Sequence, residues 1–226
     1  MAVDNNLQNN ANFFNHVYRE PGSYYGDEVR PEFNFFIKSL SCRKFVVLDL
    51  GCGEGRYSLF LAKHVHSVDS VDFSSVAIEK LNSLAIKNGL NIIPSCADVN
   101  NAVLAKEKYD LIVMATLLDH LDHTGQNRLI SKIYSSLMPG GMVYANVFTT
   151  KDPGYKIKDS TTVATKINVV SETAPAIRHY FKPLELKNSF SQYDVLEYKE
   201  FVEEDRSHGS VHIHGWASIL AQKPCS

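Results

Sequence analysis

The stretch Val46–His64, VVLDLGCGEGRYSLFLAKH, places Gly51, Gly53 and Gly55 directly after a short and mostly apolar run. Glycine loses more conformational freedom on folding than any other residue, so a cluster of it marks backbone that turns tightly or approaches a ligand. The pattern predicts a buried strand, a tight turn and a helix beginning near Arg56. In doubly wound sheets, ligands bind beyond the carboxyl ends of the strands, at turns of this kind. We therefore expect a ligand site here.

The composition is that of one ordinary globular domain. The chain has 226 residues, of which 44% are hydrophobic and 21% charged, with a formal net charge of -2. This length can bury a sizeable core, and the near-neutral charge gives no electrostatic footprint for nucleic acid. Four scattered cysteines without CxxC spacing are typical of a reducing compartment. The start, MAVDNNLQNN, does not resemble a signal peptide, and no apolar run reaches the ~18 residues of a membrane span. We expect a soluble cytoplasmic protein.

Strand-like and helix-like segments alternate along most of the chain. Apolar periodicity predicts helices over 32–40, 57–63, 74–87 and 126–137, and strands over 45–50, 65–71, 91–97, 109–115, 142–148, 193–202 and 210–221. The last two strands, joined by the polar EEDRSHG, would pair antiparallel. We predict an α/β fold with a Rossmann-like, doubly wound, seven-stranded sheet that is mostly parallel with an antiparallel last strand.

The organisation along the chain is that of a single domain over residues 1–226 with four parts. We expect an N-terminal cap or lid over 1–42, a cofactor-binding core over 43–148, an insert or substrate lid over 149–182, and a C-terminal helix and hairpin over 183–226. Residues 149–176 are polar, rich in Thr and Lys, and weakly periodic. A segment of that length in a compact domain is functional or disordered.

Acidic residues distinguish this glycine turn from a dinucleotide site. The dinucleotide pattern Gly-x-Gly-x-x-Gly would place its third glycine at Arg56, so a nicotinamide cofactor fits poorly. Asp49 would face the ligand and favours a cation over a phosphate. S-adenosylmethionine carries an ammonium group and no phosphate, so it suits this turn.

Two further acids follow later strands. Asp72 could grip two ribose hydroxyls, with Asp69 as a rival inside the strand, and Asp98 is placed for the adenine end. Each acid alone could instead cap a helix or a turn. Three of them at three successive strand ends favour a nucleoside site.

Four segments, LDLGCGEGRYSLFLA, VDSVDFSSVAIEKL, CADV and YDLIVMATLLDHL, resemble the successive motifs of class I S-adenosylmethionine-dependent methyltransferases. The resemblance implies S-adenosyl-L-methionine as cofactor and S-adenosyl-L-homocysteine as product. It implies that Asp49, Gly51 and Gly53 line the methionine moiety, that Asp72 holds the ribose, that Asp98 and Val99 hold the adenine, and that Ala115 and Thr116 face the cofactor. We add four neighbouring residues as candidates for cofactor binding: Tyr25, Cys52, Arg56 and Phe73.

The subfamily is indicated by the ends of the chain. GCGEGRYSLFLA, a preceding YYG and the ending VEEDRSHGSVHIHGWASILAQK are together similar to the tellurite-resistance (TehB-like) group of small-molecule methyltransferases. The 149–176 segment departs from that group because it is longer than in its lean members. The resemblance implies a small-molecule acceptor.

Candidate bases for the acceptor occur in two clusters. Methyl transfer requires alignment of the nucleophile, and a hydroxyl or amine acceptor must also lose a proton to a base. His120, in LLDHLDH after the fourth strand, would border the methyl group as a base or as part of the pocket wall. An acceptor that is already a soft anion, such as a thiolate, has no proton to lose and therefore needs no base.

The second cluster lies in the last strand. His212, His214 and Trp216 would share one face because strand side chains alternate, with Val211 and Ile213 pointing into the core. The two histidines could act in catalysis, form a substrate wall or be solvated. A transition-metal site is a weaker alternative, and we expect no metal.

Two aromatic or basic stretches remain open to two interpretations. Arg178, His179 and Tyr180 could hold an anionic substrate or form a strand before the next helix. Tyr24 and Tyr25 could close over the methionine end of the cofactor or simply pack.

These patterns together predict an enzyme that methylates a small molecule. The alternatives are a methyltransferase acting on RNA or protein, a non-catalytic S-adenosylmethionine-binding protein, and a nicotinamide-dependent oxidoreductase, which Arg56 disfavours. We expect no nucleic-acid or membrane partner. The acceptor atom and the choice between monomer and homodimer stay open.

Overall fold

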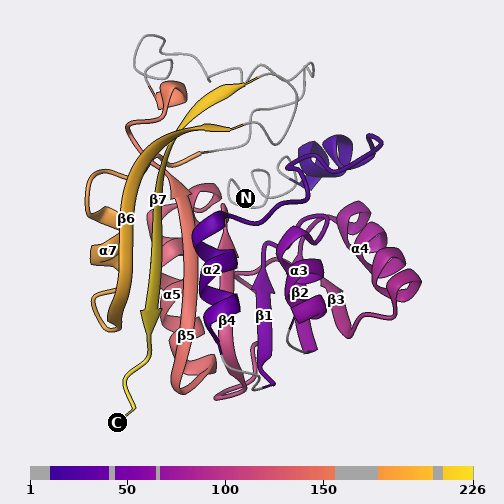
Figure 1. The fold of residues 1–226 in the computed structure, drawn as a ribbon, viewed down its shortest axis with the longest axis horizontal. Coiled ribbons are helices and arrows are strands. Elements are labelled where there is room, and N and C mark those ends of the chain that lie inside the picture. Colours follow the sequence, from indigo (N-terminus) through magenta and orange to yellow (C-terminus); the bar gives the residue numbers. More distant parts are fainter. Residues whose placement is uncertain (1–10, 41–43, 65–66, 156–177, 206–210, 226) are drawn as a thin grey trace.

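The computed structural model describes residues 11–40, 44–64, 67–155, 178–205 and 211–225, which form one seven-stranded sheet flanked by helices (Figure 1). The strand order is β3-β2-β1-β4-β5-β7-β6. β7 runs antiparallel to both neighbours, and every other neighbouring pair is parallel. The predicted fold class is confirmed. The strands are β1 (Val46–Leu50), β2 (Ser67–Asp72), β3 (Ile92–Cys96), β4 (Tyr109–Ala115), β5 (Leu137–Phe148), β6 (Asp194–Asp205) and β7 (His212–Gln222).

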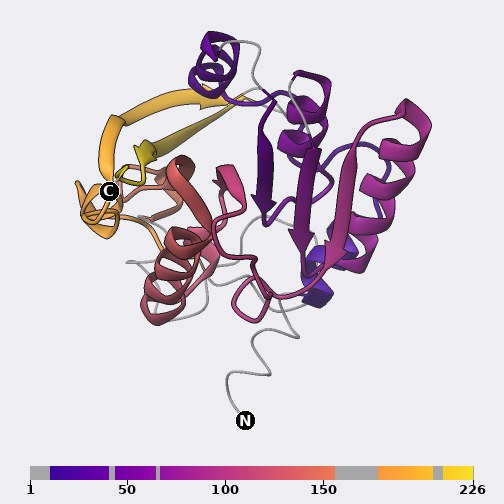
Figure 2. The same cartoon turned by 90° about the horizontal axis from the view of Figure 1, so that it is seen from below.

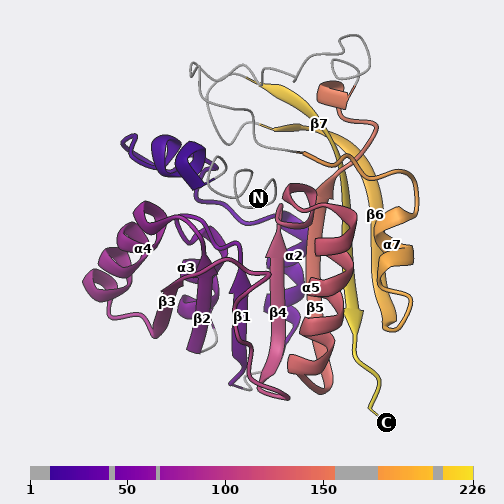
Figure 3. The ribbon, with the colours of Figure 1, turned by 180° about the vertical axis from the view of Figure 1, so that it is seen from behind.

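Helices cover both faces of the sheet. Side chains of α2, α3 and α4 share a buried cluster on the face seen in Figure 1, and α5 and α7 pack on the face seen in Figure 3. Figure 2 shows the same layers from below. A further helix over 11–17 lies near the carboxyl ends of the central strands. The elements are α2 (Pro31–Ser39), α3 (Arg56–His64), α4 (Ser75–Asn88), the 3-10 helix η1 (Leu118–His120), α5 (His123–Ser136) and α7 (Glu185–Ser189).

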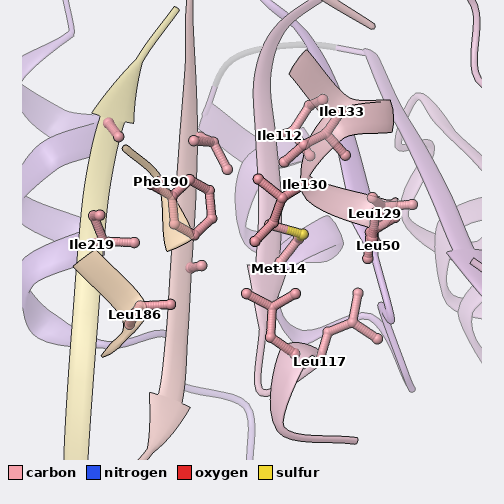
Figure 4. Close-up of a cluster of buried hydrophobic side chains, with 14 of the residues drawn as sticks. Leu50, Ile112, Met114, Leu117, Leu129, Ile130, Ile133, Leu186, Phe190 and Ile219 are labelled. Carbon is pink, nitrogen blue, oxygen red and sulfur yellow. The ribbon is translucent and has the colours of Figure 1, made fainter. Parts of the chain in front are cut away.

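The central strand β4 is an almost continuous apolar run because both of its faces are buried. Ile112 and Met114 are buried against α5 and α7, and Val113 is buried against α2 and α3. Figure 4 shows Ile112 beside Ile133 and Met114 beside Ile130, both of α5. A strand covered on both faces has no polar face to show, as is usual in parallel sheets.

Helix ends follow local capping chemistry. The predicted cap Ser74 accepts a hydrogen bond from the Ala77 N–H at 3.2 Å, and Gly89 ends α4 with a φ of 62°. The predicted start of the next helix at Gln126 was wrong. Asp122 accepts from the Gly125 N–H at 2.7 Å and starts α5 at His123. The cap, rather than the first good helix former, sets the boundary.

The predicted orientation of the last strand is wrong at its start. Val211 and Ile213 are 54% and 53% exposed, whereas Trp216 is buried. β5 ends at Phe148, which pairs with Trp216, so the residues of β7 before Gly215 pair only with β6. This part of the hairpin extends past the hydrophobic core, so Val211 and Ile213 have no core to pack into.

Packing at Gly55 supplies a test of the fold. A Cβ here would lie 2.3 Å from Leu81 Cδ1, and φ is +93°, so Gly55→Ala combines a clash with backbone strain. We expect the free energy of unfolding in urea to fall by about 2–5 kcal/mol. The control Gly89→Ala also has a positive φ (+62°) but open space around it, and should cost about 1 kcal/mol. Equal losses in the two variants would contradict the packing argument.

Candidate functional site

A cavity opens beyond the carboxyl ends of β1, β2 and β4. The empty space in it, with the open mouth included, is about 690 Å³. Most of the residues predicted from the sequence meet here. Those that line the cavity are Tyr25, Asp49, Gly51, Cys52, Gly53, Arg56, Asp72, Phe73, Ala115, Thr116 and His120.

The glycine turn forms the floor of this cavity. Gly51 and Gly53 have φ values of +68° and +51°, which L side chains rarely adopt. A Cβ on Gly51 would lie 2.9 Å from Leu117 Cδ1, and one on Gly53 would lie 2.9 Å from the Tyr18 hydroxyl. The N–H groups of Gly51 and Cys52 donate to the Val71 carbonyl at 2.8 and 3.1 Å. The turn is therefore fixed to β2, and the glycines expose its backbone to the cavity without a side chain in between.

Asp49 is a buried acid at the cavity wall. Its Oδ2 accepts a hydrogen bond of 2.6 Å from Ser58, whose hydroxyl also lies 2.8 Å from that of Ser70. Burial raises the pKa of Asp49 to about 6, although the Ser58 hydrogen bond opposes the rise. Near neutral pH the ionised carboxylate is thus poorly compensated by water, and a bound cation would stabilise it.

Asp72 lies at the tip of β2, against the glycine turn. Its Oδ2 accepts from the Gly53 N–H at 2.9 Å and its Oδ1 from the Ser74 N–H at 2.8 Å. Burial raises its pKa, and these backbone hydrogen bonds oppose the rise. The rival Asp69 pairs instead with Lys108 and with the Tyr109 hydroxyl at 2.8 Å, away from the cavity.

Asp98 and Val99 are not among the residues that line the cavity. Asp98 accepts hydrogen bonds from the Asn100 N–H at 3.0 Å and from Asn101 Nδ2 at 2.8 Å, so it caps the turn after β3. Val99 is buried in the core. Their assignment to the adenine end stays a prediction.

The N-terminal segment covers the cavity, which the sequence indicated only through its density of aromatic residues. Phe14 and Tyr18 line the cavity beside Tyr25. Burial raises the pKa of both tyrosines, so they stay neutral. Phe14, Tyr18 and Glu54 were not predicted, because nothing local in the sequence marks them as cavity residues. Glu54 accepts from the Tyr24 N–H at 2.7 Å and from Lys80 Nζ at 2.7 Å, which fastens the segment to the glycine turn and α4.

The predicted histidines occupy different places. His120 lines the cavity and meets the Phe14 ring edge-to-face at 5.3 Å. His214 does not line it; its Nδ1 lies 2.8 Å from Asp152 Oδ2. The His212 side chain is outside the described part of the structure. Within that part, no group of three His, Cys, Asp or Glu residues is placed to hold a metal ion.

Arg178 and Tyr180 stay together, whereas His179 has other partners: burial raises the pKa of Tyr180, and the neighbouring Arg178 opposes that rise. The Arg178 guanidinium lies 4.2 Å over the Phe148 ring, and its Nε is 3.7 Å from Asp119 Oδ2. His179 Nε2 lies 2.8 Å from Glu185 Oε1. Phe181, the next residue, forms a parallel bridge with Thr149, so a short extended segment is present before α7. Residues 156–177, which contain most of the predicted insert, lie outside the described residues.

Comparison with known proteins agrees with this geometry. Residues 47–141 match the protein family described as "Methyltransferase domain". These residues of the chain are similar to that family. A ubiquinone biosynthesis O-methyltransferase from Coxiella burnetii is 30% identical over 142 residues, which cover 62% of this chain and 58% of that protein. A probable S-adenosyl-L-methionine-dependent methyltransferase, TehB from Haemophilus influenzae, is 30% identical over 155 residues, covering 68% of this chain and 48% of that protein.

Solved structures share the fold of this chain. An S-adenosylmethionine-dependent methyltransferase from Methanosarcina mazei superposes with a TM-score of 0.72 at 22% identity, covering 88% of this chain and all of that one. TehB from Haemophilus influenzae superposes with a TM-score of 0.68 at 24% identity, covering 94% of this chain and 66% of that one. The predicted resemblance to the tellurite-resistance group is confirmed. The chain spans about half the length of the curated relatives that it matches.

No helix among the described residues is both long and apolar enough to cross a membrane. The described cysteines, Cys52, Cys96 and Cys225, are free thiols.

The raised pKa of Asp49 predicts how stability depends on pH. The pKa rises from an ordinary 3.8 to about 6 on folding, so the folded protein binds the proton more tightly than the unfolded chain. The contribution of protonated Asp49 to the free energy of unfolding is fully present below pH 4. It is lost as the pH rises through 6, which lowers the free energy of unfolding by about 3 kcal/mol.

Asp49→Asn should therefore stabilise the ligand-free protein by up to about 3 kcal/mol at pH 8 and by much less at pH 4.5. Urea unfolding at both pH values measures this. A variant that is less stable than wild type at pH 8 contradicts the burial argument.

Proposed function

We propose that this protein is an S-adenosyl-L-methionine-dependent methyltransferase that acts on a small molecule and leaves S-adenosyl-L-homocysteine. The observation that carries the proposal is the pair of buried carboxylates, Asp49 and Asp72, on either side of a bare glycine turn in one cavity. An acid that is costly to ionise without a cation suits the ammonium group of this cofactor. The family match at residues 47–141 supports the same cofactor.

Six of the cavity residues have a role in this proposal. Asp49 would bind the ammonium group, the exposed backbone at Gly51 and Gly53 would lie against the methionine and ribose, and Asp72 would hold the ribose hydroxyls. When bound, the cofactor supplies a methyl group on a positively charged sulfur, and the carbon–sulfur bond breaks with its electron pair left on sulfur. Tyr18 and Tyr25, held over the cavity, would exclude water.

A small acceptor suits the covered cavity. The N-terminal segment, fastened through Glu54 and Lys80, adds its aromatic side chains to the cavity wall, which would favour a small acceptor over a folded RNA or protein. Relatives include an O-methyltransferase of ubiquinone biosynthesis, which supports an oxygen acceptor. His120 would be the base nearest the methyl group. His214, oriented by Asp152, and His212 are further candidates.

A non-catalytic cofactor-binding protein is the second candidate function. The same carboxylates and glycines would serve it equally, since they bind the cofactor and take no part in proton transfer. Transfer of a labelled methyl group to any small acceptor would exclude it.

Substitution of Asp72 tests the cofactor proposal. Asp72→Asn should weaken S-adenosylmethionine binding at least about 100-fold, because an amide loses the charge-assisted hydrogen bonds of a carboxylate. Isothermal titration calorimetry of folded protein measures the affinity, with circular dichroism as the folding check.

The matched control is Asp69→Asn, in an acid three residues earlier whose partners Lys108 and Tyr109 lie outside the cavity. It should bind the cofactor within about threefold of wild type. Near-normal binding by a folded Asp72→Asn protein would falsify the ribose assignment.

A further inference from the structure

Three buried polar side chains beyond the cofactor cavity lack hydrogen bonds. Asn146, Asp119 and Trp216 are 1%, 0% and 5% exposed. Within the part of the chain that the structure describes, no hydrogen-bond partner is present for Asn146 Oδ1, the two Asp119 carboxylate oxygens or Trp216 Nε1. A buried polar group left unpaired costs about 1–3 kcal/mol, so native proteins retain few of them without a reason. A group of such atoms next to a binding cavity indicates a ligand that supplies the missing hydrogen bonds.

Asn146 is directly beside the cavity. It pairs in register with Ala115 across β4 and β5, and its carbonyl accepts from the Thr116 N–H at 2.9 Å. Ala115 and Thr116 both line the cavity. Because strand side chains alternate, Asn146 shares a face with Tyr144, whose ring packs with those of α2 and α3. Asn146 therefore lies on the cavity side of the sheet.

Trp216 lies on the same face, one strand further. It pairs in register with Phe148, two residues beyond Asn146, and the two rings stack with centroids 4.1 Å apart. Arg30 lies 5.0 Å from the Trp216 ring centroid. The indole is thus fixed in place by aromatic and cation–π contacts while its N–H donates to nothing.

Asp119 closes the group from the end of β4. It precedes the cavity residue His120, and its Oδ2 is 3.7 Å from Arg178 Nε, too far for a hydrogen bond. Arg178 lies over the Phe148 ring, which stacks on Trp216. Asp119, which pairs with Arg178, is therefore close to these two rings. The charges of Asp119 and Arg178 compensate each other, which leaves hydrogen-bonding capacity but no net charge from this pair.

We propose that Asn146, Asp119 and Trp216 form the subsite for the methyl acceptor, and that the subsite selects a neutral molecule bearing hydroxyl groups. A hydroxyl both donates and accepts, so it can pair with the carboxylate or amide oxygens and with the indole N–H. A fully ionised oxyanion gains no net attraction from this pair, because the charges of Asp119 and Arg178 compensate each other, and it has no proton to donate to the Asp119 or Asn146 oxygens. The inference rests on the proposed function.

The test uses Trp216, which is the only tryptophan in the sequence. Protein saturated with S-adenosylhomocysteine is titrated with catechol as the neutral hydroxyl probe and with selenite as the oxyanion probe, and Trp216 fluorescence is followed. We expect saturable quenching by catechol and none by selenite. Calorimetry gives the affinity of each protein for S-adenosylhomocysteine.

Two variants and a control separate binding from folding. Asn146→Leu removes the unpaired amide at similar volume, so Tm should rise or stay the same while catechol binds at least about tenfold more weakly. Asp119→Asn should also weaken catechol at least about tenfold. Ser218→Ala, at the register partner of Asn146 on β7, should keep wild-type catechol affinity.

The outcomes are distinct. Weaker catechol binding in Asn146→Leu and Asp119→Asn with unchanged S-adenosylhomocysteine affinity supports the subsite. No quenching of the wild type by catechol, quenching by selenite instead, or wild-type catechol affinity in Asn146→Leu overturns it and leaves the proposed function standing. Failure of the wild type to bind S-adenosylhomocysteine contradicts the proposed function, and the subsite with it.

Discussion

The hydrogen bonds that join the glycine turn to the end of β2 are the constraint on which the rest of the site depends. The Gly51 and Cys52 N–H groups donate to the Val71 carbonyl, and the Gly53 N–H donates to Asp72. Two adjacent parallel strands therefore end in one rigid edge, with the acids of both turned toward the same space. Every other wall of the cavity, from the end of β4 to the N-terminal segment, is placed against this edge.

The site keeps polar groups buried with few hydrogen bonds, which lowers the stability of the fold. Asp49 has a raised pKa because it is buried, and Asn146, Asp119 and Trp216 keep unpaired polar atoms in the interior. Such groups lower stability, and proteins retain them where a ligand compensates the cost. Asp49 faces the proposed cofactor, and the other three lie on the side from which the acceptor would approach. Cofactor and acceptor would thus each complete a different part of one polar surface.

Much of the fold and of the cofactor side could be predicted because the signals are local in the sequence. A strand, glycine turn and helix, with acids at strand tips, identified Asp49 and Asp72 before any contact was known. The helix cap at Asp122, the exposure of Ile213 and the Asp152–His214 pair could not be predicted, since each depends on which element ends where in space. Phe14 and Tyr18 were missed for the same reason: only tertiary packing brings an N-terminal helix over the turn.

The central claim is that this cavity binds S-adenosylmethionine. Native mass spectrometry of the purified protein, mixed with equal concentrations of S-adenosylmethionine and NAD, tests it most directly. The account predicts one bound S-adenosylmethionine, or S-adenosylhomocysteine retained from purification, and no NAD. A complex with NAD, or no nucleoside complex at all, would contradict it.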